Sequence, residues 1–186
     1  MNLLPILLFS FLLSLVPFSV ALSSSVYRCI VWKEALRIAF VFALFQAGML
    51  AIGWLIGFGV KGLLYDMAVP VAVLIVLFIA FRIFMDSLRP GRENRTMAVE
   101  DRPILLGFAF VISINTALLG MGLGILYKDI LLLAGFLSGM VFLMTIAGVQ
   151  AGKRGMMNLG RTAEMLGGAG LAITGVIIIL QYLKIL

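Results

Sequence analysis

Six apolar runs of about twenty residues, separated by polar gaps, constrain this chain more than any other feature of its sequence. A helix needs ~20 mostly apolar residues to cross the hydrocarbon core of a bilayer. The runs are continuous rather than alternating, which excludes an outer-membrane β-barrel. The sequence therefore predicts an all-α integral membrane protein. Its six spans are expected at roughly 3–22, 34–58, 67–88, 104–126, 130–151 and 163–183.

Composition excludes a soluble domain of any size. Hydrophobic residues make up 63% of the chain and charged residues 12%, whereas soluble domains have ~45–50% and ~25%. Cys29 is the single cysteine and there is no histidine, so an internal disulfide and a cysteine-cluster metal site are both excluded. An enzyme is not expected, because no histidine or mid-span acid is present to act as a general base.

Two local signals mark the first span. Pro17 has no N–H group and removes one backbone hydrogen bond near Ser14, and the serine run at 23–25 predicts the turn that follows the span. A cleaved signal peptide begins with a positive region, but no Lys or Arg precedes Arg28. We therefore expect the first span to be retained as a helix.

The basic residues predict the orientation of the chain. If the N-terminus lies outside, only Lys61, Lys128 and Lys184 of the 14 Lys and Arg residues lie on the outer side. The positive-inside rule then places both termini outside an inner (plasma) membrane of bacterial type. The net charge of +6 is explained by this topology. The expected partners are the lipid bilayer and a small ion or solute, with a homodimer left open and no nucleic acid.

The two halves of the sequence share a weak internal repeat. Three residues of the first half have a counterpart 95 positions later, namely Glu34 with Asp129, Gly53 with Gly148, and Gly57 with Gly152. Two three-span units would be inverted relative to each other, an arrangement that builds secondary transporters with a site near the midplane. We expect a first repeat at 1–88, a cytoplasmic linker at 89–103 and a second repeat at 104–186. The alternative is that capping acids and glycines recur in any helical membrane protein.

Glycines in the spans are expected to let helices approach each other closely. This role is predicted for the glycine pairs of the repeat and for two adjacent glycines of the sixth span, Gly167 and Gly168.

Polar side chains in the middle of the spans are all neutral. The eight acids lie in loops or near helix ends, not at midplane depth, where an ionisable residue would mark an ion pathway. Gln46 and Asn115 lie halfway along the second and fourth spans, and their carbonyls are hard oxygen ligands. A shared site for a substrate or metal would add the hydroxyls of Ser14, Ser113 and Thr116. The alternative is interhelical hydrogen bonding alone.

Three charged residues near the inner side are candidates for a gate. Arg82 and Asp86 are four residues apart on the third span, and Glu164 lies beside the inner end of the sixth. The alternatives are an arginine that extends to the membrane surface beside its helix-end partner and, for Glu164, a helix cap.

Several motifs keep a fixed order along the chain, namely Glu34-Ala35-Leu36-Arg37, Ile52-Gly53-Trp54 with Gly57, Arg82 with Asp86, Gly120-Met121-Gly122-Leu123, and Ala163-Glu164-Met165-Leu166-Gly167-Gly168 with Gly152 and Gly160. Together they resemble the MntP manganese efflux pump family, within the LysE-type transporter superfamily. The resemblance implies six spans in two inverted repeats with both ends outside. It also implies export of Mn²⁺ by alternating access, with Mn²⁺ as substrate and no cofactor.

The chain departs from that family's pattern at its intramembrane acids. Val16 stands at the Asp of a Ser-x-Asp-Ala motif in the first span, and Gln46 stands at the Glu of the second. The fourth-span copy of the motif reads Ser113-Ile114-Asn115-Thr116. Because Mn²⁺ prefers carboxylates, two alternatives stay open. One is a transporter of the same fold for a less charged solute, and the other is a non-transporting membrane partner protein.

Overall fold

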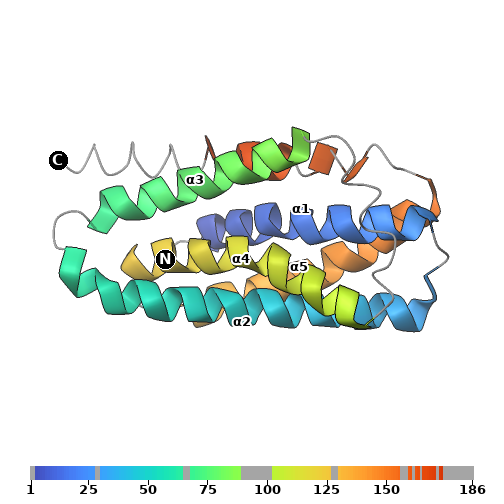
Figure 1. The fold of residues 1–186 in the computed structure, drawn as a ribbon, viewed down its shortest axis with the longest axis horizontal. Helices are drawn as coiled ribbons and strands as arrows, with labels where there is room; N and C mark the ends of the chain where they lie inside the picture. The colour runs from blue at the N-terminus through green and yellow to red at the C-terminus, as the bar shows by residue number, and fades with distance from the viewer. Residues whose placement is uncertain are drawn as a thin grey trace.

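The computed structural model describes residues 3–27, 30–64, 68–88, 102–126, 130–155, 159–160, 162–163, 165–170 and 172–173. Within these residues the helices are α1 (Leu3–Tyr27), α2 (Trp32–Leu64), α3 (Ala68–Leu88), α4 (Arg102–Leu126) and α5 (Leu131–Lys153). Further helical residues lie between 159 and 173. The helices lie lengthwise beside one another in an elongated bundle (Figure 1).

Three helices of the described part are long and apolar enough to cross a membrane, over Trp32–Gly62, Pro103–Ile125 and Leu131–Lys153. α1 and α3 contain the shorter apolar stretches Ser10–Val26 and Pro70–Ile83. Large apolar side chains that are more than half exposed cover the outside of the bundle, among them Phe40, Leu44, Leu55, Leu74, Phe78, Phe81, Leu131 and Leu143. Such a surface suits lipid tails and not water. The expectation of a helical multi-pass membrane protein is confirmed.

The prediction of a turn at residues 23–25 is wrong, because α1 continues through the serines to Tyr27. The Ser24 hydroxyl donates to the Val20 carbonyl at 2.8 Å, and the Ser25 hydroxyl lies 3.1 Å from the Leu22 carbonyl. A serine favours turns because its hydroxyl competes for backbone groups. In an apolar bundle the same hydroxyl is satisfied by its own helix, so the helix continues. Pro17 also lies inside this unbroken helix.

α2 begins with a cap that its sequence supplies. The N–H of Val31 donates to the Glu34 carboxylate at 3.2 Å, and the N–H groups of Glu34 and Ala35 both donate to the Val31 carbonyl at 3.0 Å. A carboxylate at this position satisfies a backbone donor that has no partner within the helix. It also complements the positive end of the helix dipole.

α2 packs against α4 so closely that their backbones meet. A Cβ atom added at Gly53 or Gly57 would collide with the backbone of Ala117 or Met121 on α4. In return, a Cβ atom at Gly124 would lie 2.9 Å from the backbone nitrogen of Phe58 on α2. Residue numbers rise together along both helices, so α2 and α4 run parallel.

α1 packs against α5 in the same way. A Cβ atom at Gly148 would collide with the Phe18 carbonyl, and one at Gly152 would collide with the Leu22 carbonyl and the Ser25 hydroxyl. The space at Gly152 lets the Ser25 hydroxyl reach the Val149 carbonyl at 3.0 Å. Here too residue numbers rise together, so α1 and α5 run parallel.

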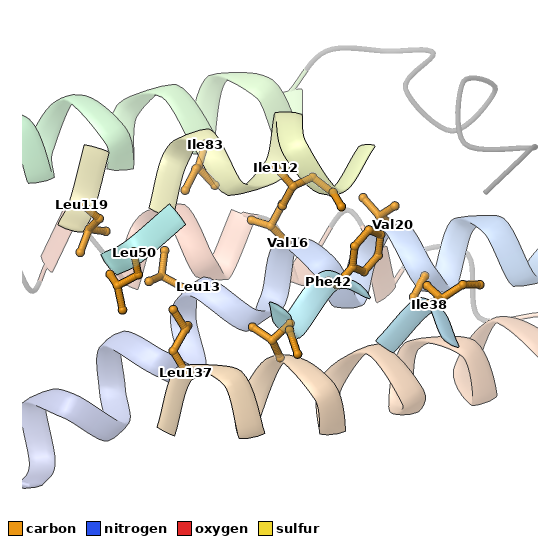
Figure 2. Packing of buried hydrophobic residues seen from close by; sticks show 14 of the residues in the cluster. Leu13, Val16, Val20, Ile38, Phe42, Leu50, Ile83, Ile112, Leu119 and Leu137 are labelled. Carbon is orange, nitrogen blue, oxygen red and sulfur yellow. The ribbon is translucent and has the colours of Figure 1, made fainter. Parts of the chain in front are cut away.

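A hydrophobic cluster fills the centre of the bundle. Figure 2 shows Leu13, Val16 and Val20 of α1 facing side chains from the neighbouring helices. These side chains include Phe42 and Leu50 of α2, Ile83 of α3, Ile112 and Leu119 of α4, and Leu137 of α5. The polar residues that the sequence selects lie on the same helices, between these apolar positions.

Candidate functional site

A hydrogen bond between Gln46 and Thr116 joins α2 to α4 inside the bundle. Gln46 lies on α2 between the core residues Phe42 and Leu50 and is 2% exposed, while Thr116 on α4 is 1% exposed. The Thr116 hydroxyl donates to the side-chain oxygen Oε1 of Gln46. The structure therefore brings these two candidate residues together. The bond satisfies an amide oxygen that would be costly to bury unpaired.

Asn115 supplies a second amide beside this contact. Its side-chain oxygen Oδ1 is buried and has no hydrogen-bond partner in the part of the chain that the structure describes. Leaving a buried polar atom unpaired costs about 1–3 kcal/mol. Successive residues of an α-helix point about 100° apart around its axis, so Asn115 does not point in the same direction as Thr116. The unpaired oxygen marks a place where a cation or a hydrogen-bond donor would be stabilised.

The two candidate serines bond within their own helices. The Ser14 hydroxyl donates to the Phe11 carbonyl at 2.7 Å, and the Ser113 hydroxyl donates to the Ala109 carbonyl at 2.6 Å. Neither is hydrogen-bonded to Gln46 or Asn115 within the described residues. Each hydroxyl oxygen still has lone pairs with which to accept a bond or bind a cation.

Val16 stands where a carboxylate would make this region a cation site. It is 5% exposed and belongs to the hydrophobic cluster, facing Phe42 and Ile112 (Figure 2). No group of three or more acidic, cysteine or histidine side chains capable of holding a metal occurs among the described residues. Along the described lengths of α1, α4 and α5, charged residues occur only at the ends. The oxygen donors of the site are therefore neutral amides and hydroxyls.

Sequence reasoning missed one polar residue of the interior. Ser10 on α1 is fully buried, and its hydroxyl has no hydrogen-bond partner among the described residues. Its position one turn before Ser14 puts both serines on one face of α1. That spacing was the signal available in the sequence.

The gate candidates are described only in part. Arg82 lies on α3 and is half-buried. Asp86 belongs to α3, but its side chain lies outside the described residues, as does the whole of Glu164. The gate stays a prediction. Of the other packing glycines that the sequence selects, Gly167 and Gly168 are both buried, and a Cβ atom at Gly167 would lie 3.1 Å from the Leu12 carbonyl.

Comparisons with known proteins cover the part of this region that lies on α2 to α5. The profile of a family described as "Putative manganese efflux pump" matches residues 29–179, which include α2 to α5. Among curated relatives named "Putative manganese efflux pump MntP", the protein of Rippkaea orientalis is 29% identical over 169 residues, covering 90% of both chains.

Two further relatives carry the same name. The protein of Corynebacterium glutamicum is 31% identical over 159 residues, covering 82% of this chain and 83% of its own. The protein of Xanthomonas euvesicatoria pv. vesicatoria is 30% identical over 159 residues and 82% of both chains. No solved structure matches this chain significantly.

Proposed function

Because the chain belongs to the manganese efflux pump family, we propose that it is a secondary transporter that exports Mn²⁺ across the inner membrane by alternating access. The family profile and the curated relatives cover most of the chain, and the bundle presents an apolar surface suited to lipid. The observation that carries the proposal at the level of residues is the buried pair of Gln46 and Thr116, next to Asn115, whose buried Oδ1 atom has no partner among the described residues.

Helix directions support six spans in two inverted repeats. α2 and α4 are parallel, so the chain must cross back between them. α3 has 21 residues, which gives a length of about 31 Å at 1.5 Å per residue, enough for that crossing. Inverted repeats relate the first span to the fourth and the second to the fifth. The contact of α2 with α4 then corresponds to that of α5 with α1, and both of these contacts are built on glycines.

The same arrangement supports a site between the repeats. Gln46 belongs to the first proposed repeat and Thr116 to the second, so their hydrogen bond joins the two repeats. Carbonyl and hydroxyl oxygens are hard donors that Mn²⁺ accepts. A neutral site lacks the counter-charge that offsets the desolvation of a dication. We therefore expect weak Mn²⁺ binding, which suits a carrier that must also release its substrate.

Cellular manganese tests this function. Expression in a manganese-sensitive host should lower the manganese content of cells grown with excess Mn²⁺, as measured by elemental analysis. Gln46→Ala and Asn115→Ala should remove most of this effect, because each deletes an amide oxygen of the site. Gln150→Ala is the matched control, because Gln150 is an exposed glutamine near the end of α5. Unchanged manganese in cells with normal amounts of the wild-type protein would contradict the proposal.

A second candidate function follows from the position of Val16 in the apolar cluster. With no carboxylate among the described residues there, the same fold would suit a less charged solute. This alternative predicts that purified wild type does not bind Mn²⁺ measurably. It also predicts that the triple variant Val16→Asp, Gln46→Glu, Asn115→Asp does bind the ion. Measurable Mn²⁺ binding by the wild-type protein in a calorimetric titration would contradict this alternative function.

A further inference from the structure

We propose that Thr116 is a positioning residue of the transport site, whose hydroxyl holds the Gln46 amide against α4 beside Asn115. The effect on transport rests on the function proposed above, whereas the effect on the orientation of Gln46 does not.

The Thr116 hydroxyl donates to a side chain of another helix, whereas the Ser25 hydroxyl reaches a backbone carbonyl of α5. Ser14, Ser113 and Thr145 each donate to a carbonyl of their own helix, at 2.6–2.7 Å. Thr116 donates across the helix contact to Gln46. A hydroxyl has one proton to donate, so bonding to Gln46 replaces the local bond that a threonine in a helix otherwise makes.

The helix backbones hold this contact at a fixed distance. Gly120 lies one turn after Thr116, and Leu50 lies one turn after Gln46. A Cβ atom at Gly120 would collide with the Leu50 carbonyl, so α2 and α4 touch immediately beside the hydrogen bond. Because the contact is rigid, the hydroxyl of Thr116 is presented to the glutamine at a constant place.

Gln46 needs such a partner because its side chain is long and rotatable. Glutamine loses substantial rotamer entropy when one conformer is fixed, and a buried amide oxygen without a partner is costly. In a carboxylate site, charge would orient the side chain toward a cation. In this neutral site the hydrogen bond from Thr116 takes over that role and fixes the amide against α4.

Three variants separate positioning from general packing. Thr116→Val removes the hydroxyl with little change of shape, Thr116→Ser keeps it, and Thr145→Val removes a buried hydroxyl that bonds only within α5. In proteoliposomes, Thr116→Val should raise the KM for Mn²⁺ about tenfold and change the maximal rate less than twofold. Thr116→Ser and Thr145→Val should leave the KM within about twofold of wild type. An unchanged KM in Thr116→Val, or an equal rise in Thr145→Val, overturns the proposal.

A second measurement does not depend on transport. The chain has three glutamines, Gln46, Gln150 and Gln181, so ¹⁵N-glutamine labelling gives few side-chain amide signals, and Gln46→Ala assigns that of Gln46. Thr116→Val should shift this signal, while Thr116→Ser and Thr145→Val should leave it near its wild-type position. An unmoved Gln46 signal in Thr116→Val refutes the positioning role. A shifted signal in a protein that exports no Mn²⁺ would refute the proposed function alone.

Discussion

At the scale of single residues, the candidate site in the interior of this membrane protein consists of neutral side chains that form hydrogen bonds rather than of charged ones. Gln46 is paired with Thr116, Val16 is packed among apolar side chains, and the side-chain oxygen of Asn115 has no partner in the described part of the chain. Amides bind a cation through a dipole rather than a full charge, so their attraction for Mn²⁺ is weaker than that of a carboxylate. The affinity for Mn²⁺ and its dependence on pH should therefore both change when a carboxylate replaces an amide.

Gln46→Glu should bind Mn²⁺ at least about tenfold more tightly than wild type at neutral pH, as measured by calorimetry on purified protein. The Thr116 hydroxyl can donate to a carboxylate as it does to the amide. A carboxylate takes up a proton as the pH falls, and the metal binds the deprotonated form. The affinity of this variant should therefore fall at acid pH.

In the wild-type protein, the residue at position 46 should cause no loss of Mn²⁺ affinity at acid pH, because an amide does not titrate. Gln150→Glu adds a carboxylate at an exposed position and serves as the control, with affinity and pH profile expected to match wild type. Equal affinities of wild type and Gln46→Glu would mean that Gln46 does not contact the ion.

At the scale of helices, glycines determine which partners meet. Sequence reasoning identified the glycine pairs of α2 and α5 as packing positions, and the structure supplies the partner helix of each. That information was absent from the sequence, because glycine spacing marks a face of a helix but does not say what lies against it. The bond from Thr116 to Gln46 was unpredictable for a similar reason, since it depends on the rotation of α4 relative to α2.

Helix ends show a second limit of the sequence. The continuous apolar runs placed α1 to α5, but α1 extends five residues beyond its expected end and α2 extends six beyond its own. Hydropathy marks the stretch suited to the hydrocarbon core, whereas backbone hydrogen bonding carries the helix further. Within the extension of α1, the hydroxyls of Ser24 and Ser25 bond to carbonyls of the same helix.

Gly53→Ala should destabilise the bundle by about 1–3 kcal/mol, the range for overpacked interiors. Its Cβ atom would collide with the Ala117 carbonyl on α4. Gly48→Ala is the matched control on the same helix, because nothing lies within 4 Å of its Cβ position. Alanine favours a helix by up to ~1 kcal/mol over glycine, so this control should be neutral or stabilising. Thermal unfolding in detergent measures both, and equal melting temperatures would contradict the close contact.

At the scale of the whole molecule, parallel pairing of α2 with α4 and of α1 with α5 is the feature that most restricts the topology. Because α2 and α4 are parallel, the segment between them must cross back over the length of the bundle. The apolar length of α3 fits that return, and the distribution of basic residues predicts its direction. The sequence can predict a direction because charge asymmetry is a composition signal, but it could not predict the pairing.

Single cysteines should report this topology. Cys29 is the only cysteine, so a Cys29→Ala background carries none. Lys128→Cys and Lys184→Cys should react with a membrane-impermeant maleimide added to intact cells, and Lys153→Cys should react only after the cells are opened. The opposite orientation would be shown if, in intact cells, the Lys153→Cys variant reacts and the Lys128→Cys variant does not.

The close contact between α1 and α5 also has a consequence for the biosynthesis of the protein. Leu22 of α1 meets Gly152 of α5, a position that the ribosome reaches 130 residues later. At about 5–20 residues per second, α1 waits roughly 6.5 to 26 s before its partner is made. During that time the face of α1 that meets α5 lacks its partner helix. The complete absence of charged residues from α1 is what allows a helix to remain inserted while it waits.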